Sequence, residues 1–211
     1  MNLYELFKRC LTIDYVRTRE SGDYAMEKRG TVLYIFLEHS DGREDWKNNV
    51  RFSTEPYECE GEETLYVHRG FLKVWRAIAP HLEETMMDPS ISKIVTVGYS
   101  HGAALAAFCH DYARHCRPDL AGHIRGYGFA SPRVFRGTPT QRTKARWEAF
   151  TVVRIPNDLV THLPPAFAGY FHVGSMLELC ENGKYSALDA HRQESILAEL
   201  KAFSEMSGEN G

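Results

Sequence analysis

The sequence Gly-Tyr-Ser-His-Gly at residues 98–102 constrains the fold more than any other stretch of the chain. An apolar, β-branched run at residues 94–97 precedes it, and a run of small residues at 103–106 follows it. This order predicts a strand, a sharp turn and a helix, with the hydroxyl of Ser100 exposed at the turn. Gly98 and Gly102 flank the serine because the backbone segments of such a turn approach too closely for a Cβ atom. The motif therefore predicts a serine nucleophile.

Runs with strand character alternate with helical periodicity along the chain. Strands are predicted at residues 11–17, 24–27, 31–37, 64–67, 94–97, 124–130, 151–155 and 170–173. Helices are predicted at residues 68–86, 103–112, 138–150 and 190–203. This alternation predicts an α/β fold with a largely parallel sheet. In the third helix, Thr138 and Pro139 give a start signal, and Arg142, Lys144 and Arg146 are expected to form a solvated face.

Composition limits the classes of protein to which this fold can belong. With 211 residues, of which 43% are hydrophobic and 25% charged, the chain is expected to form one domain over residues 1–211. Residues 1–11 read as an amphipathic helix, and residues 204–211 as a frayed tail. A net charge of −3 gives no indication of nucleic acid or of an anionic membrane surface as a partner. No run approaches the ~18 apolar residues of a membrane span.

The N-terminal residues and the cysteines bear on the cell compartment and on the chemistry of the chain. The first residues lack the continuous apolar stretch of a secretory signal, so we expect a cytoplasmic protein, although a mature secreted form would have the same pattern. The five cysteines are widely spaced and form no Cys-x-x-Cys pair. We therefore expect buried or idle thiols. No His-Glu-x-x-His motif occurs, and the spacing of His110 and His115 does not place them on one helix face, so we expect no metal ion.

Three polar residues follow predicted strands and should meet at one edge of the sheet. Ser40, Ser100 and Asp158 come after the strands at 31–37, 94–97 and 151–155. A serine nucleophile requires a base to accept its proton and an acid to orient that base, and their order in such folds is serine, acid, histidine. Three histidines lie downstream of Asp158. His162 lies too near Asp158 in the same loop and His172 lies within a strand-like segment, so we predict that His191 is the base.

Several segments, in the same order, resemble the class 3 (fungal-type) lipase family of the α/β-hydrolase superfamily. The matching segments are 67–71 (Val-His-Arg-Gly-Phe), the elbow at 97–105, 128–134 (Gly-Phe-Ala-Ser-Pro-Arg-Val), 154–165, 169–174 and 189–197. The resemblance covers about residues 31–200. It implies the α/β-hydrolase fold, with a mostly parallel central sheet flanked by helices in one domain. It also implies that His172 is a structural histidine and that no cofactor is needed.

The resemblance further implies an oxyanion hole formed by Ser40 and by the backbone N–H of His101. His39 stands where the family usually has a glycine, whereas Trp46 keeps the family's spacing from the hydroxyl residue. We expect substrate contacts from His39, Trp46, Leu163 and Phe167.

The expected activity is hydrolysis of carboxylic esters, of small molecules or of lipids, through an acyl-enzyme on Ser100. Residues 41–49, which cover the site in the family, hold five charged residues and one large apolar residue, Trp46. Because those charges would oppose contact with lipid, we expect short- to medium-chain acyl esters and little interfacial activation. The alternatives are a phospholipase A1, an aryl-ester (feruloyl-type) esterase and a non-catalytic binding domain on the same scaffold.

Overall fold

The computed structural model describes residues 1–18, 22–38, 53–58 and 64–206. Its main sheet has six strands in the order β1-β2-β5-β6-β8-β10. These strands are β1 Tyr24–Arg29, β2 Val32–Leu37, β5 Lys93–Tyr99, β6 Ile124–Phe129, β8 Phe150–Arg154 and β10 Ser175–Glu178. Only the β1–β2 pair is antiparallel, while the other neighbours in this sheet are parallel. The predicted α/β fold with a mostly parallel sheet is therefore confirmed.

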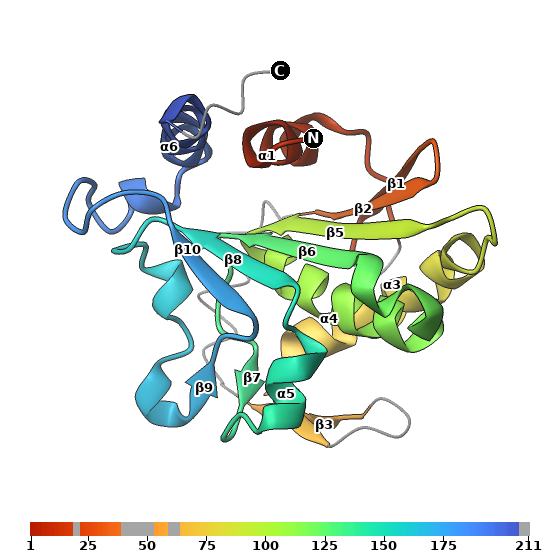
Figure 1. The fold of residues 1–211 in the computed structure, drawn as a ribbon. Helices are drawn as coiled ribbons and strands as arrows, with labels where there is room; N and C mark the ends of the chain where they lie inside the picture. Colours follow the sequence, from red (N-terminus) through yellow and green to blue (C-terminus); the bar gives the residue numbers. More distant parts are fainter. Residues whose placement is uncertain (19–21, 39–52, 59–63, 207–211) are drawn as a thin grey trace.

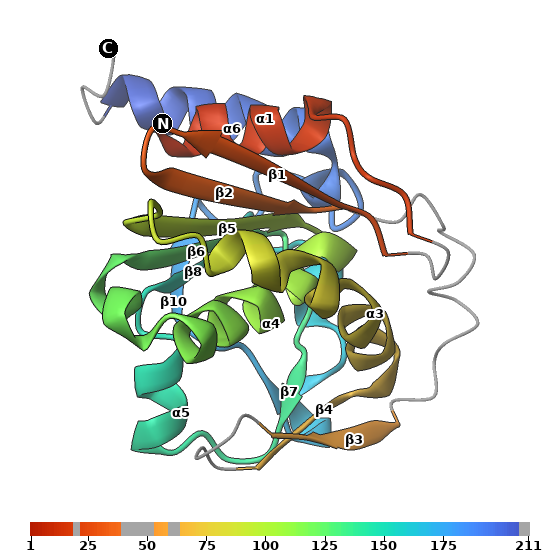
Figure 2. The ribbon, with the colours of Figure 1, turned by 90° about the vertical axis from the view of Figure 1, so that its right-hand side faces the viewer.

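Helices cover both faces of this sheet (Figures 1 and 2). Helices α1 (Leu3–Thr12) and α6 (Gln193–Met206) lie side by side on one face, and α3 (Arg69–Met86) and α4 (His101–Cys116) lie on the other. Along β5, Val95, Val97 and Tyr99 pack toward α1 and α6, while Ile94 joins the core on the opposite face. Because both faces of the sheet are buried, the central strands have continuous apolar sequences and no alternation of polar and apolar residues. In the described part of the chain, no helix combines the length and hydropathy needed to cross a membrane.

A second, antiparallel sheet lies beyond the α3 and α4 layer, at the bottom of Figure 2. Its strands run in the order β3-β4-β7-β9. They are β3 Thr54–Tyr57, β4 Leu65–His68, β7 Phe135–Arg136 and β9 Tyr170–Phe171. The sequence predicted the strands near 64–67 and 170–173 but not β3, β7, β10 or the separate sheet that β3 and β7 help to form.

Some predicted element boundaries were wrong. The strand expected at residues 11–17 is absent, because α1 continues to Thr12 and beyond it only Val16 forms an isolated bridge, to Tyr24. At the C-terminal end, α6 continues to Met206, so residues 204–206 belong to the helix and not to a frayed tail. The remainder of that tail, residues 207–211, lies outside the described residues.

The helix predicted at 138–150 was wrong at both ends. Helix α5 spans only Gln141–Arg146, and its N-cap is Thr140, which exchanges side-chain and backbone hydrogen bonds with Thr143. This reciprocal capping box satisfies two N–H groups, so it fixes the helix start after Pro139. Residue 150 already belongs to β8.

The solvated face predicted for α5 was only partly right. Arg142 and Lys144 are exposed, but the side chain of Arg146 is buried. Its guanidinium forms an ion pair with Asp111 of α4, with 2.6 Å between Nη2 and Oδ2. Arg146 was expected in solvent from the local charge pattern, but its ion pair with a residue of another helix places it in the interior.

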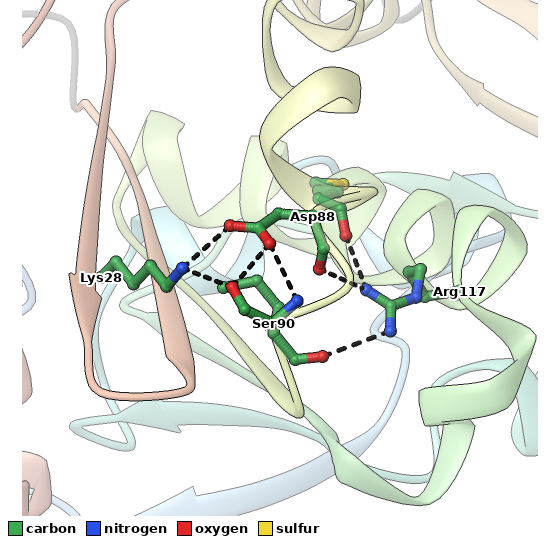
Figure 3. A network of polar contacts seen from close by, with 6 residues as sticks. Lys28, Asp88, Ser90 and Arg117 are labelled. Carbon is green, nitrogen blue, oxygen red and sulfur yellow. Dashed lines mark hydrogen bonds and ion pairs between the residues drawn. The ribbon is translucent and has the colours of Figure 1, made fainter.

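A polar network holds the turn between α3 and β5 (Figure 3). The guanidinium of Arg117 donates to the carbonyl oxygens of Met86, at 2.9 Å, and of Ile91, at 3.2 Å. Asp88 accepts hydrogen bonds from the backbone and hydroxyl of Ser90 and from the ammonium group of Lys28 on β1. The Arg117 guanidinium thus satisfies the carbonyl group of Met86, the last residue of α3, which the helix leaves without an intrahelical partner, and the carbonyl group of Ile91 in the turn that follows. It thereby anchors the start of β5, the strand that leads to Ser100.

Candidate active site

Ser100 occupies a strained turn between β5 and α4. Its backbone angles are φ 54° and ψ −116°, a combination that residues other than glycine rarely adopt. Two hydrogen bonds fix the turn, from the Ser100 N–H to the Phe129 carbonyl at 2.9 Å and from the Ala103 N–H to the Ser100 carbonyl at 3.1 Å. The strand-turn-helix arrangement predicted around the serine is therefore present, and such strain is typical of a nucleophile elbow.

The two glycines of the motif are required by close backbone contacts. A Cβ atom at Gly98 would lie 2.0 Å from the carbonyl oxygen of Gly102, and a Cβ atom at Gly102 would lie 2.2 Å from that of Leu37. Neither contact is sterically possible, so both positions exclude a side chain. The second contact also places the end of β2, at Leu37 and Glu38, directly beside the elbow.

The structure brings Ser100, His191 and Asp158 into one hydrogen-bonded chain. The Ser100 hydroxyl lies 2.9 Å from His191 Nε2, and His191 Nδ1 lies 2.8 Å from Asp158 Oδ2. Asp158 is fully buried, and its other carboxylate oxygen accepts the Val160 N–H at 2.9 Å. The imidazole therefore lies between a hydroxyl that can give up a proton and a carboxylate that can fix the ring's tautomer.

The three residues come from distant parts of the chain. Ser100 follows β5, and Asp158 lies in the loop after β8. His191 is the last residue of a one-turn 3₁₀ helix, η4 (Asp189–His191), and the final helix begins only at Gln193. The prediction that His191 belongs to that final helix was therefore wrong by a few residues, although the histidine lies against the serine.

The other two histidines downstream of Asp158 bind backbone carbonyl groups. His162 Nε2 donates to the Pro156 carbonyl at 2.9 Å, and His172 Nε2 donates to the Thr161 carbonyl at the same distance. Burial lowers the pKa of His172 to about 4, so its ring is neutral at physiological pH. Both rings hold the loop that carries Asp158, and this arrangement fits the structural role that the resemblance implied for His172.

Of the remaining predicted site residues, the structure describes only three, His101, Leu163 and Phe167. His101 is the first residue of α4, where the backbone N–H groups and the helix dipole favour negative charge. His39, Ser40 and Trp46 lie outside the described residues. Leu163 is half-buried, whereas Phe167 is 94% exposed on a short 3₁₀ turn, η3 (Ala166–Ala168). Substrate contact by these two residues stays a prediction.

One neighbour of the histidine was missed by the sequence reasoning. The Tyr99 hydroxyl donates a hydrogen bond to the carbonyl oxygen of His191. The only signal in the sequence was the position of Tyr99 directly before Ser100 in the motif. No group of three or more His, Cys, Asp or Glu side chains that could hold a metal ion occurs among the described residues.

Comparison with known proteins decides the family. Residues 34–168 match the family model for lipase (class 3). The chain belongs to the class 3 lipase family. The matched region contains Ser100 and Asp158 but ends before His191, so the hydrogen bonds described above are what connect that histidine with the other two residues.

Individual relatives are more distant and longer. A lipase of Rhizomucor miehei is 28% identical over 169 residues, which cover 75% of this chain and 45% of that protein. The chain therefore spans about half the length of this curated relative. A fungal lipase in complex with an inhibitor has a TM-score of 0.64 and 24% identity, covering 78% of this chain and 64% of its own. Lipase II from Rhizopus niveus has a TM-score of 0.62 and 20% identity, covering 76% and 63%. These likenesses confirm the α/β-hydrolase fold.

Proposed function

We propose that this member of the class 3 lipase family is a serine hydrolase of carboxylic esters. The observation that carries the proposal is the hydrogen-bonded chain from Ser100 through His191 to Asp158, with distances of 2.9 and 2.8 Å. Hydrolysis of an ester through a serine needs a nucleophile, a base and an orienting acid, and this chain supplies all three in contact.

In the proposed mechanism, the Ser100 oxygen attacks the carbonyl carbon of the ester while His191 Nε2 accepts the hydroxyl proton. The carbonyl oxygen becomes an oxyanion in the tetrahedral intermediate. The intermediate collapses when His191 donates the proton to the leaving alcohol, which leaves the acyl group on Ser100. Water then attacks the acyl-enzyme by the same steps, with His191 again as base, and releases the carboxylic acid. Asp158 holds the His191 Nδ1–H throughout and stabilises the imidazolium.

We assign the oxyanion hole to the backbone N–H of His101 and to Ser40. The close approach of Gly102 to Leu37 and Glu38 supports this assignment, because residue 40 follows the end of β2 by only a few positions. Replacing Ser40 with alanine should lower kcat by up to ~10²- to 10³-fold if the hydroxyl donates to the developing charge. An unchanged kcat would limit residue 40 to its backbone N–H.

For the substrate we propose short- to medium-chain acyl esters. A related structure, with a TM-score of 0.62 and 22% identity, is described as a triacylglycerol lipase whose catalytic centre is a serine protease triad. That relative supports glycerol esters as one substrate class for this chain. The charged residues at 41–49 support esters in solution over an oil surface, because placing those charges against lipid is unfavourable.

A panel of p-nitrophenyl esters of increasing acyl length tests the proposal, with Ser100→Ala as the control. We expect hydrolysis that favours short and medium chains and disappears in the Ser100→Ala variant. A phospholipid and a feruloyl ester in the same panel test the phospholipase A1 and aryl-ester alternatives. Absence of activity on every ester by a folded protein would favour the non-catalytic alternative.

Rates on a short-chain triglyceride, followed through its solubility limit, test the expectation about interfaces. We expect the rate to pass that limit without a jump. A sharp rise there would contradict the argument from the charged segment and favour a lipase that acts at an interface.

A further inference from the structure

Tyr99 makes two different contacts with His191. It is the last residue of β5, directly before Ser100, and its side chain is only 5% exposed. Its hydroxyl donates to the His191 carbonyl oxygen, and its ring stacks on the imidazole, with 5.4 Å between centroids and 25° between planes. One side chain therefore restrains both the backbone and the ring of the histidine.

Packing against the aromatic core holds Tyr99 itself in place. Phe7 of α1 meets the Tyr99 ring edge-on, at 5.4 Å and 79°, and packs on Phe129 at 4.7 Å. Phe7 and Phe129 are fully buried. Because the buried Tyr99 ring packs against the fully buried Phe7, its hydroxyl is a fixed point for the segment that it binds.

The segment that carries His191 lacks regular secondary structure that would fix its position. It follows a connection without a long helix or strand, residues 179–188, and ends in the one-turn helix η4. Several of its hydrogen bonds are internal, such as Ala190 N–H to the Ser186 carbonyl at 2.9 Å and Arg192 N–H to the Asp189 carbonyl at 3.0 Å. Internal bonds shape the turn, while the Leu159 N–H, which donates to the Ala187 carbonyl at 3.2 Å, and the Asn157 amide, which donates to the Tyr185 carbonyl, tie the segment to the loop after β8. The bond from Tyr99 links it to the strand that ends at the nucleophile.

We infer that Tyr99 is a positioning residue that sets the His191 imidazole at hydrogen-bond distance from the Ser100 hydroxyl. Since Tyr99 and Ser100 are consecutive, the end of β5 fixes both nucleophile and base, and their separation depends on one rigid element. The inference rests on the proposed function. It extends that proposal by giving a role to the first variable residue of the Gly-x-Ser-x-Gly motif.

The test is Tyr99→Phe, which keeps the ring and removes the hydroxyl. The matched control is Tyr57→Phe in the second sheet, which also removes one buried tyrosine hydroxyl, here one that donates to Asp111 at 2.8 Å. Two quantities are measured for each variant, namely kcat and KM on a p-nitrophenyl ester, and the downfield proton resonance of the His191–Asp158 hydrogen bond. The melting temperature of each variant shows how much stability is lost with the buried hydroxyl, so that this general effect can be separated from an effect on His191.

For Tyr99→Phe we expect kcat to fall by about 10- to 100-fold with KM within about twofold of the wild type, because small misplacement of a catalytic group costs rate more than binding. The downfield resonance should shift or broaden. Tyr57→Phe should lose stability but keep both kcat and the resonance.

Two outcomes would overturn the inference. The first is a Tyr99→Phe variant with the kcat of the control, and the second is an unchanged resonance. The resonance does not depend on turnover, so it still judges the role of Tyr99 if the wild type hydrolyses no ester. In that case the proposed function fails separately.

Discussion

The Asp111–Arg146 pair makes a strong test of how this core is stabilised. The two side chains are 4% and 5% exposed. Arg146 donates to both carboxylate oxygens, from Nε at 2.9 Å and from Nη2 at 2.6 Å, and the Tyr57 hydroxyl also donates to Asp111. The guanidinium lies 4.7 Å from the centre of the Trp147 ring. The pair therefore joins α4, α5 and β3 inside the protein.

We predict that Arg146→Met lowers the free energy of unfolding by about 3–5 kcal/mol, because it leaves the Asp111 carboxylate buried without its cation. This is a large part of the total stability of about 5–15 kcal/mol that is usual for a domain. The triple variant Tyr57→Phe, Asp111→Leu, Arg146→Met removes the hydroxyl and both charges together. It should recover most of the loss, since apolar residues of similar volume often replace a buried pair without cost.

Urea denaturation at neutral pH, followed by far-UV circular dichroism, measures both variants against the wild type. A loss below about 1 kcal/mol for Arg146→Met is the value expected of a solvated surface residue, and it would refute the argument. A triple variant less stable than the single one would also refute it, because the cost would then lie in lost packing and not in an uncompensated charge.

Three further predictions concern the fold. Burial lowers the pKa of His110 to about 3, so its ring is neutral in the folded chain while the unfolded chain binds a proton below about 6.5. The free energy of unfolding should therefore fall as pH drops from about 6.5 toward 3. His110→Leu should reduce the slope of that free energy against pH, over the same range, by about 1.4 kcal/mol per pH unit. A variant with an unchanged slope would contradict this prediction. Gly98→Ala should lower the free energy of unfolding by about 2 kcal/mol or more and reduce activity, because the added Cβ atom would lie 2.0 Å from the Gly102 carbonyl oxygen. A Gly98→Ala variant with the melting temperature and kcat of the wild type would contradict this close contact. Arg117→Met should lower the free energy of unfolding, measured by urea denaturation, by about 1–3 kcal/mol, because it leaves the carbonyl groups of Met86 and Ile91 without their donor. An unchanged free energy of unfolding would show that water replaces the guanidinium.

The elbow was predictable because its signal is local. Glycine at 98 and 102, a serine between them and small residues after them act within one strand-turn-helix unit, and the structure has that unit with Ser100 at a positive φ of 54°. The alternation of strands and helices likewise predicted a largely parallel main sheet, although not its edge strand β10. Asp158 followed from its place after a strand, because parallel strands end at one edge of the sheet.

What the sequence did not predict depends on partners that are distant in the chain. The strand β7 has only two residues, too few for any periodicity, and it exists through pairing with β4 on one side and β9 on the other. Arg146 has its partner 35 residues away, so a local charge pattern wrongly placed it in solvent. The bond from Tyr99 spans 92 residues to His191, and only the folded chain brings these two side by side.

The activated serine is the central claim, and labelling by a fluorophosphonate tests it most directly. Such a reagent phosphonylates a serine whose hydroxyl is activated by a neighbouring base. Mass spectrometry of the labelled protein should find one adduct, on Ser100, and labelling should be absent in Ser100→Ala and slower by orders of magnitude in His191→Ala. A folded wild-type protein that takes no label, or takes it at a residue other than Ser100, would contradict the account.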